Sequence, residues 1–238
     1  MIEVQNLTKS YGGRVVVDDL SLTVTTGSVF GFLGQNGSGK TTTIKMMVGI
    51  SVPDGGSVRI GGKDSSDLSM REHIGFMPEA PYFYDRLTGL EFLEFCGKLF
   101  RKHRSEHAYS EILKQVGIYD ARNRPINTYS KGMKQRLGFA QALVNDPNYI
   151  FLDEPLDGLD PLGRREIKNM IVDLKKRGKT IFFNSHILYD TEEICDEIGV
   201  IHEGRLLYVG GVKEFCKGQP LEKRFVATVE AKLITNNS

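Results

Sequence analysis

A glycine-rich segment between an apolar run and a helix-like stretch places the tightest constraint on this chain. The apolar run is Val29–Leu33, and Ile44, Met47 and Val48 follow the segment at helical spacing. The segment itself matches the G-x-x-x-x-G-K-[ST] pattern of a phosphate-binding loop. We therefore expect an α/β core with this loop at the carboxyl edge of a mostly parallel sheet. The residues that we assign to the loop are Gly34, Gln35, Asn36, Gly37, Ser38, Gly39, Lys40, Thr41 and Thr42.

The composition of this loop suits a bound polyphosphate. Its glycines let backbone N–H groups turn toward the phosphates, and the N-terminus of the following helix adds its dipole. Lys40 would reach the β- and γ-phosphates, and Thr41 would ligate Mg²⁺. The simpler alternative is a glycine-rich structural turn, which the flanking strand and helix disfavour.

A second apolar run ends in two carboxylates. Tyr149–Leu152 has the character of a buried strand, and Asp153 and Glu154 follow it. In a parallel sheet such a strand delivers its last residues to the edge where the phosphate loop lies. Asp153 is thus placed to hold Mg²⁺, directly or through water, and Glu154 to orient or deprotonate an attacking water. The alternative is that the two acids only begin a surface loop.

Two further polar residues narrow the class of protein. Ser130 precedes a helix with one apolar face, so it is a natural N-cap, and the N–H groups there offer a second anion site. His186 follows the expected strand Thr180–Phe183 and so arrives at the same sheet edge as the two carboxylates. It is a candidate for sensing the phosphate, the alternative being a histidine satisfied within the fold.

The remaining pattern divides the chain into regions. It is β-rich from the start to Leu33, with separate short strands expected at Val15–Val17 and Leu20–Thr25. Residues 85–146 have helical character and are expected to be an inserted α-helical subdomain. The fold class is therefore α/β, with a mostly parallel phosphate-loop core, an N-terminal antiparallel β subdomain and this insertion. Near the end, Phe225–Val229 has the pattern of a strand.

Local signals support the helical insertion. Thr88 and Glu91 have the spacing of a capping box. The basic cluster at 101–104 is interpreted as a solvated helix end. The apolar residues that repeat at helical spacing after the capping box are Phe92, Phe95, Cys96 and Leu99.

Composition and charge describe an ordinary globular chain. Its 238 residues carry 31 basic and 30 acidic side chains, and a net charge of +1 gives no overall field to attract nucleic acid or anionic lipid. The three cysteines are widely separated and form no Cys-x-x-Cys pair, which predicts reduced thiols rather than disulfides or a zinc site. No apolar run approaches the roughly 20 residues that cross a bilayer, and no secretory signal opens the chain, so we expect a cytoplasmic location.

In their order along the chain, these motifs resemble those of the nucleotide-binding subunit of an ATP-binding cassette (ABC) transporter. The resemblance covers the chain to about Val212. Besides the phosphate loop and the strand with two carboxylates, it rests on Asp157–Asp160, on Ser185 with His186, and on a signature that begins at Ser130. It implies an ATPase whose ligands are ATP and Mg²⁺, with residues 1–218 as the ATPase domain and 219–238 as a C-terminal extension of unknown role.

The resemblance also implies roles for residues outside the phosphate loop. Tyr11 would stack on adenine. Ser130 and Gly132 would bind the γ-phosphate held by an opposite subunit, and Asp157–Asp160 would cross to that subunit. Catalysis would depend on Lys40 together with the carboxylate and the histidine at the sheet edge. The implied working unit is a head-to-tail dimer, either a homodimer or a heterodimer of two cassettes.

Two departures from the family pattern stand out. Pro78 is followed by Glu79 where the family usually has glutamine, so a carboxylate is expected near the Mg²⁺ and the attacking water. The signature has Lys131 and Met133 where the common version has glycine and glutamine. Both departures resemble a bacterial exporter-type branch whose permeases are separate integral-membrane chains. This implies export, and a subunit held peripherally on the cytoplasmic face of the cell membrane.

Three consecutive aromatic residues suggest where a permease would bind. Pro81–Tyr84 lies between the core and the helical insertion, and its neighbouring rings cannot all point into one core. We expect at least one ring to be exposed and to receive a short cytoplasmic helix of the permease. The alternative is that the aromatic rings only attach the insertion to the core.

Other nucleotide-binding classes fit less well. No Asn-Lys-x-Asp occurs to select guanine, and a small-molecule kinase would not explain a second anion site at Ser130. The remaining alternative is a soluble ABC-class ATPase that acts on nucleic acid or ribosomes. Neither long coiled-coil heptads nor two cassettes in one chain are present, and we expect no nucleic-acid partner.

Overall fold

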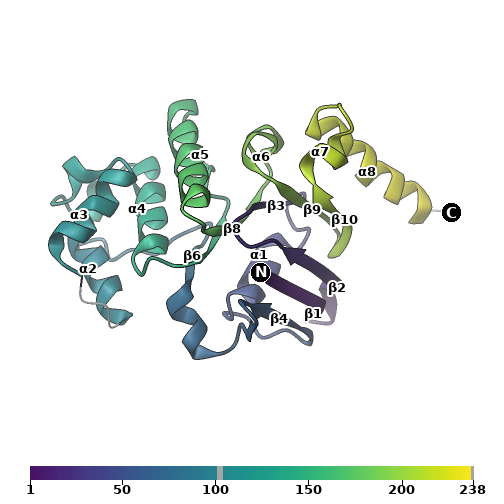
Figure 1. Ribbon diagram of the computed structural model, residues 1–238, viewed down its shortest axis with the longest axis horizontal. Helices are drawn as coiled ribbons and strands as arrows, with labels where there is room; N and C mark the ends of the chain where they lie inside the picture. The colour runs from purple at the N-terminus through teal and green to yellow at the C-terminus, as the bar shows by residue number, and fades with distance from the viewer. Residues whose placement is uncertain (101–103, 237–238) are drawn as a thin grey trace.

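A six-stranded sheet forms the centre of the protein (Figure 1). The computed structural model describes residues 1–100 and 104–236. The strand order is β10-β9-β3-β8-β7-β6, and all neighbours are parallel except the β9–β10 hairpin. The strands are β3 (Val29–Leu33), β6 (Ile74–Met77), β7 (Tyr149–Asp153), β8 (Thr180–Ser185), β9 (Glu197–His202) and β10 (Arg205–Gly211).

The register of this sheet brings three strand ends to one edge. Leu33 at the end of β3 pairs with Ser185 of β8, and Asp153 at the end of β7 pairs with Asn184. Strands β3 and β8 are buried at every position, as expected for central strands covered on both faces. The chain that leaves each of these strands therefore enters the same region, which confirms the predicted core.

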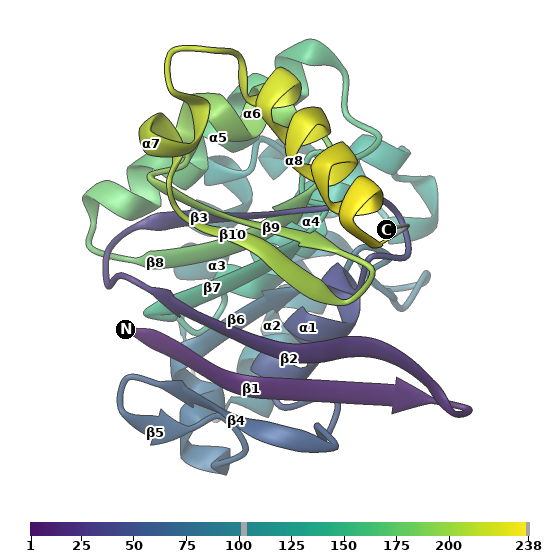
Figure 2. The ribbon, with the colours of Figure 1, turned by 90° about the vertical axis from the view of Figure 1, so that its right-hand side faces the viewer.

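A four-stranded antiparallel sheet, built from two strands before β3 and two after α1, flanks this core. Figure 2 shows β1 and β2 crossing the lower half of the molecule, below β3. The two short strands expected at the N-terminal side of β3 form one strand, β2, in which Asp19 adopts a positive φ of 50° and the pairing with β1 shifts. The order is β2-β1-β4-β5, with β1 (Ile2–Tyr11), β2 (Arg14–Val24), β4 (Gly55–Ile60) and β5 (Lys63–Asp64).

The predicted helical insertion is present between β6 and β7. Its helices gather on one side of the molecule, at the left of Figure 1. The Thr88–Glu91 capping box is confirmed: Thr88 Oγ1 accepts from the Glu91 N–H at 3.2 Å, and Glu91 Oε2 accepts from the Thr88 N–H at 2.8 Å. The elements are α2 (Gly89–Leu99), α3 (Glu106–Gln115), η2 (Tyr119–Ala121), η3 (Ile126–Thr128) and α4 (Lys131–Leu143).

The prediction that four residues of α2 form its buried apolar face is correct for two of them. Phe92 and Cys96 are buried, whereas Phe95 and Leu99 are exposed. The buried face is completed instead by Leu93, because α3 and α4 pack on that side of α2. The basic cluster, apart from Arg104, lies outside the described residues.

The C-terminal region corrects one prediction. Phe225–Val229, expected as a strand, belongs to the helix α8 (Leu221–Asn236). Leu221, Phe225 and Val229 are buried at a spacing of four residues, so one helical face packs into a cluster with Phe215 and the sheet. The polar residues at the end of the chain predict fraying through residues 236–238; Asn236 still belongs to α8, and residues 237–238 lie outside the described residues.

The other helices connect the strands. In the described part of the chain, no helix is long and apolar enough to cross a membrane. The connecting helices are α1 (Lys40–Met47), η1 (Leu68–His73), α5 (Pro161–Lys176), α6 (Leu188–Ile194) and α7 (Val212–Cys216).

Candidate functional site

The predicted phosphate loop joins β3 to α1. Gly37 and Gly39 have positive φ values of 79° and 108°, a conformation that favours glycine. A Cβ on Gly39 would also lie 2.7 Å from the Val16 carbonyl oxygen, so no larger residue fits. The Ser38 Oγ is buried and has no hydrogen-bond partner within the described residues. The loop thus presents polar groups at a helix N-terminus, as a phosphate site requires.

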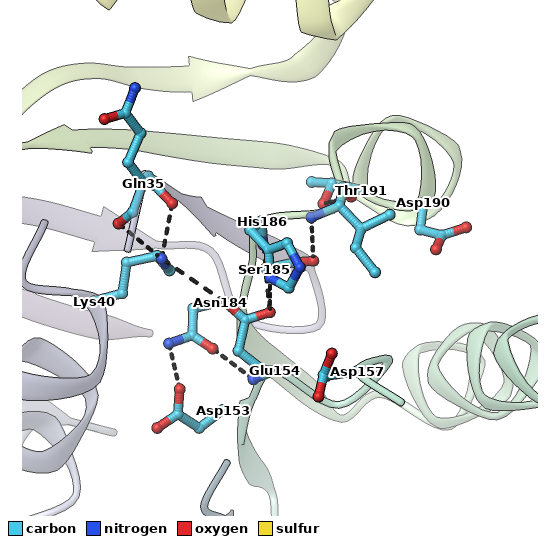
Figure 3. A network of polar contacts seen from close by, with 12 residues as sticks. Gln35, Lys40, Asp153, Glu154, Asp157, Asn184, Ser185, His186, Asp190 and Thr191 are labelled. Atoms are coloured by element: carbon cyan, nitrogen blue, oxygen red, sulfur yellow. Dashed lines mark hydrogen bonds and ion pairs between the residues drawn. The ribbon is translucent and has the colours of Figure 1, made fainter. Parts of the chain in front are cut away.

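The Lys40 side chain is buried inside this loop. Its Nζ donates to the carbonyl oxygens of Gly34 at 2.7 Å and Gln35 at 3.1 Å, as Figure 3 shows. Burial lowers the pKa of Lys40, and three nearby carboxylates act in the opposite direction. An anion entering the loop would give this ammonium a partner of full opposite charge in place of carbonyl dipoles. The three carboxylates are Glu154, Asp153 and Glu79.

Asp153 meets the phosphate loop at the end of β7. Its Oδ1 accepts from Thr41 Oγ1 at 3.1 Å and from Asn184 Nδ2 at 2.6 Å. Its Oδ2 is buried and has no hydrogen-bond partner among the residues described. A hydroxyl next to a carboxylate with an unused oxygen fits a hard divalent cation such as Mg²⁺. The described residues contain no group of three or more His, Cys, Asp or Glu side chains able to hold a metal ion.

Glu154 has a strained backbone at the centre of the site. Its φ is 51°, in the left-handed region that few side chains other than asparagine or aspartate adopt. Two side chains fix the peptide groups on either side of Glu154: Asn184 Oδ1 accepts from the Glu154 N–H at 2.7 Å, and Gln135 Nε2 donates to the Glu154 carbonyl at 3.0 Å. Strain of this kind costs about 1–3 kcal/mol and persists only where surrounding contacts hold it. Asn184 and Gln135 therefore aim the Glu154 carboxylate.

His186 contacts the other side of the same carboxylate. Its Nδ1 lies 2.9 Å from Glu154 Oε2, and its backbone N–H donates to that oxygen at 3.3 Å (Figure 3). Lys40 Nζ lies 3.8 Å from Glu154 Oε1. The Glu154 side chain is nearly buried, whereas the imidazole is about half exposed. The carboxylate thus lies between the phosphate-loop lysine and a histidine from β8.

A cavity of about 280 Å³ lies between the phosphate loop and Glu154, whereas Asp153 and His186 are not among the residues that line it. It receives Glu79 from the segment after β6, so the carboxylate that replaces the usual glutamine faces the same space as Lys40. Val16 also lines it, which nothing in the sequence indicated. The predicted site residues that line the cavity are Asn36, Gly37, Gly39, Lys40, Thr41, Thr42, Glu79 and Glu154.

Comparison with known proteins places this geometry in a family. A family model described as ABC transporter matches residues 17–157. An uncharacterized ABC transporter ATP-binding protein of Nostoc sp. is 47% identical over 203 residues, which cover 84% of this chain and 61% of that protein. The bacitracin transport ATP-binding protein BcrA of Enterococcus faecalis is 41% identical, over 91% of this chain and 71% of BcrA. The chain belongs to the ABC transporter family.

Solved structures of this family share the whole architecture. The ATP-binding subunit of an ABC transporter superposes with a TM-score of 0.87 at 28% identity and covers 96% of this chain and 99% of its own. A dimeric ATP-binding cassette in a post-hydrolysis state with ADP and Pi gives a TM-score of 0.83 at 25% identity, over 89% of this chain and 99% of its own. The region shared with the Nostoc protein is under two thirds of that relative's length.

Three residues that family resemblance assigns to nucleotide binding lie outside the cavity of this ABC family member. Ser130 caps α4, and its Oγ accepts from the Met133 N–H at 3.2 Å, as predicted for an N-cap. Gly132 lies in the first turn of the same helix. Tyr11 ends β1, is half exposed, and has Lys9 Nζ 5.4 Å from its ring centroid. None of these three lines the space around the phosphate loop.

Two residues that position Glu154 in this site were not predicted from the sequence motifs. Asn184 and Gln135 hold both peptide groups of Glu154 but were not among the predicted site residues. The one available signal was Asn184 itself, a polar residue directly after the apolar run Ile181–Phe183. Gln135 had no such signal, because its contact joins residues 19 apart in the chain.

Proposed function

We propose that this chain binds ATP and hydrolyses it to ADP and phosphate. The observation that carries the proposal is the Glu154 carboxylate, held by a strained backbone between Lys40 and His186 at the mouth of a phosphate loop. Binding of a fluorescent ATP analogue, and phosphate release from ATP by the purified chain, test it together. Absence of nucleotide binding in the presence of Mg²⁺ would contradict it.

Each side chain of the site has a separate role in the proposed hydrolysis. Lys40 exchanges the carbonyls of its own loop for phosphate oxygens, and the backbone N–H groups of the loop hold the remaining phosphates. Thr41 and Asp153 would hold Mg²⁺, whose charge offsets that of the phosphate oxygens. Glu154 orients a water and accepts its proton, and His186 keeps that carboxylate in place while contacting the terminal phosphate.

We propose that two such cassettes form the working unit. Ser130 and Gly132 of one copy would bind the γ-phosphate held by the other, and Asp157–Asp160 would lie at the interface. The position of the signature outside its own cavity supports this arrangement. So does the likeness to a dimeric cassette that holds ADP and Pi.

We further propose that the cassette drives export through a separate membrane permease, from the cytoplasmic face of the membrane. Similarity to a bacitracin transport protein supports this class of function. An apolar surface supports a protein partner: Tyr82 is 83% exposed and Tyr84 is 51% exposed, while Phe83 is 7% exposed and packs on Phe92 at 5.2 Å between ring centroids. The expectation of at least one exposed ring is thus confirmed.

This surface continues along α2, beyond the aromatic segment. The ring of Tyr84 lies 6.1 Å from that of Tyr82 and 5.5 Å from that of Phe95. One turn further, the exposed Leu99 lines a groove of about 850 Å³ together with Ile50. A contiguous exposed apolar strip beside a groove has the character of a protein interface.

Removal of one exposed ring from this strip should weaken attachment to the permease. We expect Tyr82→Ser to leave most of the protein in the soluble fraction after the membranes are sedimented, while nucleotide affinity stays within about twofold, since an exposed side chain contributes little to folding. Tyr189→Ser, which removes another exposed ring on α6, is the matched control and should remain on membranes. Normal sedimentation of Tyr82→Ser, or recovery of nucleic acid instead of a multispan protein in a pull-down from solubilised membranes, would contradict the proposal.

Glu79 should alter the metal dependence of the reaction. If its carboxylate lies in the Mg²⁺ shell, Glu79→Gln is expected to raise the Mg²⁺ concentration for half-maximal rate about fivefold at saturating ATP, an effect on the order of 1 kcal/mol. Nucleotide affinity should change less. The exposed Glu222→Gln in the first turn of α8 controls for loss of one negative charge. Superimposable Mg²⁺ titrations of wild type and Glu79→Gln would show that Glu79 is not a ligand.

A further inference from the structure

A group of charges with a buried Lys168–Asp190 pair at its centre joins α5 to α6, outside the nucleotide cavity. Lys168, from the middle of α5, has a side chain only 10% exposed, and its Nζ lies 2.8 Å from Asp190 Oδ1. The same ammonium donates to Glu193. Arg164 approaches the other Asp190 oxygen at 3.9 Å. One turn of α6 is thus held by a cation from the neighbouring helix.

These two helices follow two segments of the proposed site. Helix α5 is capped by Asp160, whose side chain accepts from the Gly163 N–H at 2.7 Å, so it starts where the Asp157–Asp160 segment ends. Helix α6 starts at Leu188, two residues after His186. The ion cluster therefore sets the distance between α5, which follows the Asp157–Asp160 segment, and α6, which follows His186.

The start of α6 is tied directly to His186. The Ile187 N–H donates to Ser185 Oγ at 2.9 Å, and Thr191 Oγ1 donates back to the Ile187 carbonyl at 3.1 Å (Figure 3). Ile187, the residue after the histidine, is thus the N-cap of α6, and its carbonyl is held by Thr191 of that helix. A rotation or shift of α6 would carry His186 with it.

Helix α6 depends on such outside contacts for its position. It has seven residues, far fewer than an isolated helix needs, and its N-cap residue Ile187 provides no side-chain cap. Its first turn contains the buried Asp190, and Glu192 accepts from the Leu221 N–H of α8 at 2.9 Å. Burial lowers the pKa of Lys168, but its hydrogen bonds to the two carboxylates outweigh this and leave the pKa above its ordinary value. Lys168 is therefore charged at neutral pH.

We propose that Lys168 is a positioning residue for ATP hydrolysis, which acts through Asp190 and α6 to hold the His186 imidazole against Glu154. This rests on the proposed roles of Glu154 and His186. The Lys168 ammonium pairs with two carboxylates of α6, so it fixes both the rotation of α6 and its distance from α5. Apolar packing alone would constrain that rotation less, because it is not directional. Nucleotide binding at the phosphate loop does not involve this cluster.

The test is the effect of Lys168→Met on turnover by the full chain. Methionine keeps the aliphatic stem and removes the charge. We expect kcat to fall about tenfold and KM for ATP to change less than about twofold, because small misplacement of a site residue affects the reaction more than substrate binding. Lys168→Arg, which restores the cation, should recover most of the rate. Lys176→Met, on the same helix with an exposed pair to Asp173, is the matched control.

Positioning must be separated from folding. Lys168→Met leaves the buried Asp190 with only the more distant Arg164 as a cation, which lowers Tm. Lys168→Met/Asp190→Asn removes both charges, so we expect it to keep a Tm near wild type and still to show the reduced kcat. A wild-type kcat in this double variant would overturn the inference.

A cycle with His186→Ala identifies the route of the effect. If Lys168 acts through His186, adding Lys168→Met to His186→Ala should lower kcat by less than about twofold further. If His186→Ala lowers kcat and Lys168→Met lowers it further by its full separate factor, the two residues act independently. That result would overturn the inference about Lys168 and leave the proposed role of His186 standing. A wild-type rate in His186→Ala would overturn the proposed role of His186 and the inference with it.

Discussion

Glu154→Gln is expected to reduce ATP hydrolysis by about 10²- to 10⁴-fold while leaving ATP binding intact, the range that loss of a general base produces. Glutamine keeps the shape of the side chain but cannot accept the proton of an attacking water. The substitution also removes one negative charge from the cavity that holds Lys40, so repulsion of the γ-phosphate falls. ATP should then hold two copies together, because the step that would release them is blocked.

Gel filtration with ATP and Mg²⁺, alongside a phosphate-release assay, measures both effects. We expect Glu154→Gln to elute as a dimer with ATP and as a monomer without it. Glu203→Gln is a matched control, since Glu203 is exposed and also has a positive φ, of 47°, but lies in the turn between β9 and β10. Turnover by Glu154→Gln near the wild-type rate would show that Glu154 is not the catalytic carboxylate.

A composite active site predicts a second large effect. Ser130→Arg should bind ATP through its own Lys40 yet lose nearly all turnover, because the arginine is presented to the nucleotide of the opposite subunit. The substitution also removes the N-cap hydrogen bond of α4, which costs about 1 kcal/mol of stability. Ser105→Arg removes the equivalent cap of α3 and is the matched control, expected to keep its activity. Turnover by Ser130→Arg alone would refute a required contact in trans.

Mixing two inactive variants gives a sharper form of this test. In a heterodimer of Ser130→Arg with Lys40→Ala, one site carries both lesions and the other carries neither. We expect activity to appear in the mixture although each variant alone is inactive, with a maximum near equal concentrations. Phosphate release across a series of mixing ratios measures it, and a flat response at the background level of the two separate variants contradicts sharing of residues between copies.

The spacing of residues in the sequence was sufficient to predict those parts of the fold that depend on neighbours along the chain. The phosphate loop, the capping box at Thr88 and the cap at Ser130 each need only a few consecutive residues, and all three are present. The convergence of Asp153 and His186 was also predictable, because parallel strands end at one edge of a sheet.

Long-range packing explains the predictions that failed. The β-branched and aromatic residues of Phe225–Val229 suit a strand, but the burial of Phe225 and Val229 together against Phe215 requires the four-residue period of a helix. Likewise Phe95 and Leu99 repeat with Phe92, yet only the packing of α3 and α4 decides which side of α2 is covered.

The sequence by itself determined which chemical groups enter the site: the phosphate loop with Lys40 and Thr41, the carboxylates of Asp153 and Glu154 at the end of β7, and His186. Only the tertiary structure decided how those groups are held. Glu154 keeps its positive φ because Asn184 and Gln135 hold the peptide groups on either side of it, and His186 is followed by a helix that Lys168 contacts. These contacts join segments far apart in the chain. Local spacing carries no record of such contacts, because they form only when β7, β8 and the surrounding helices pack together.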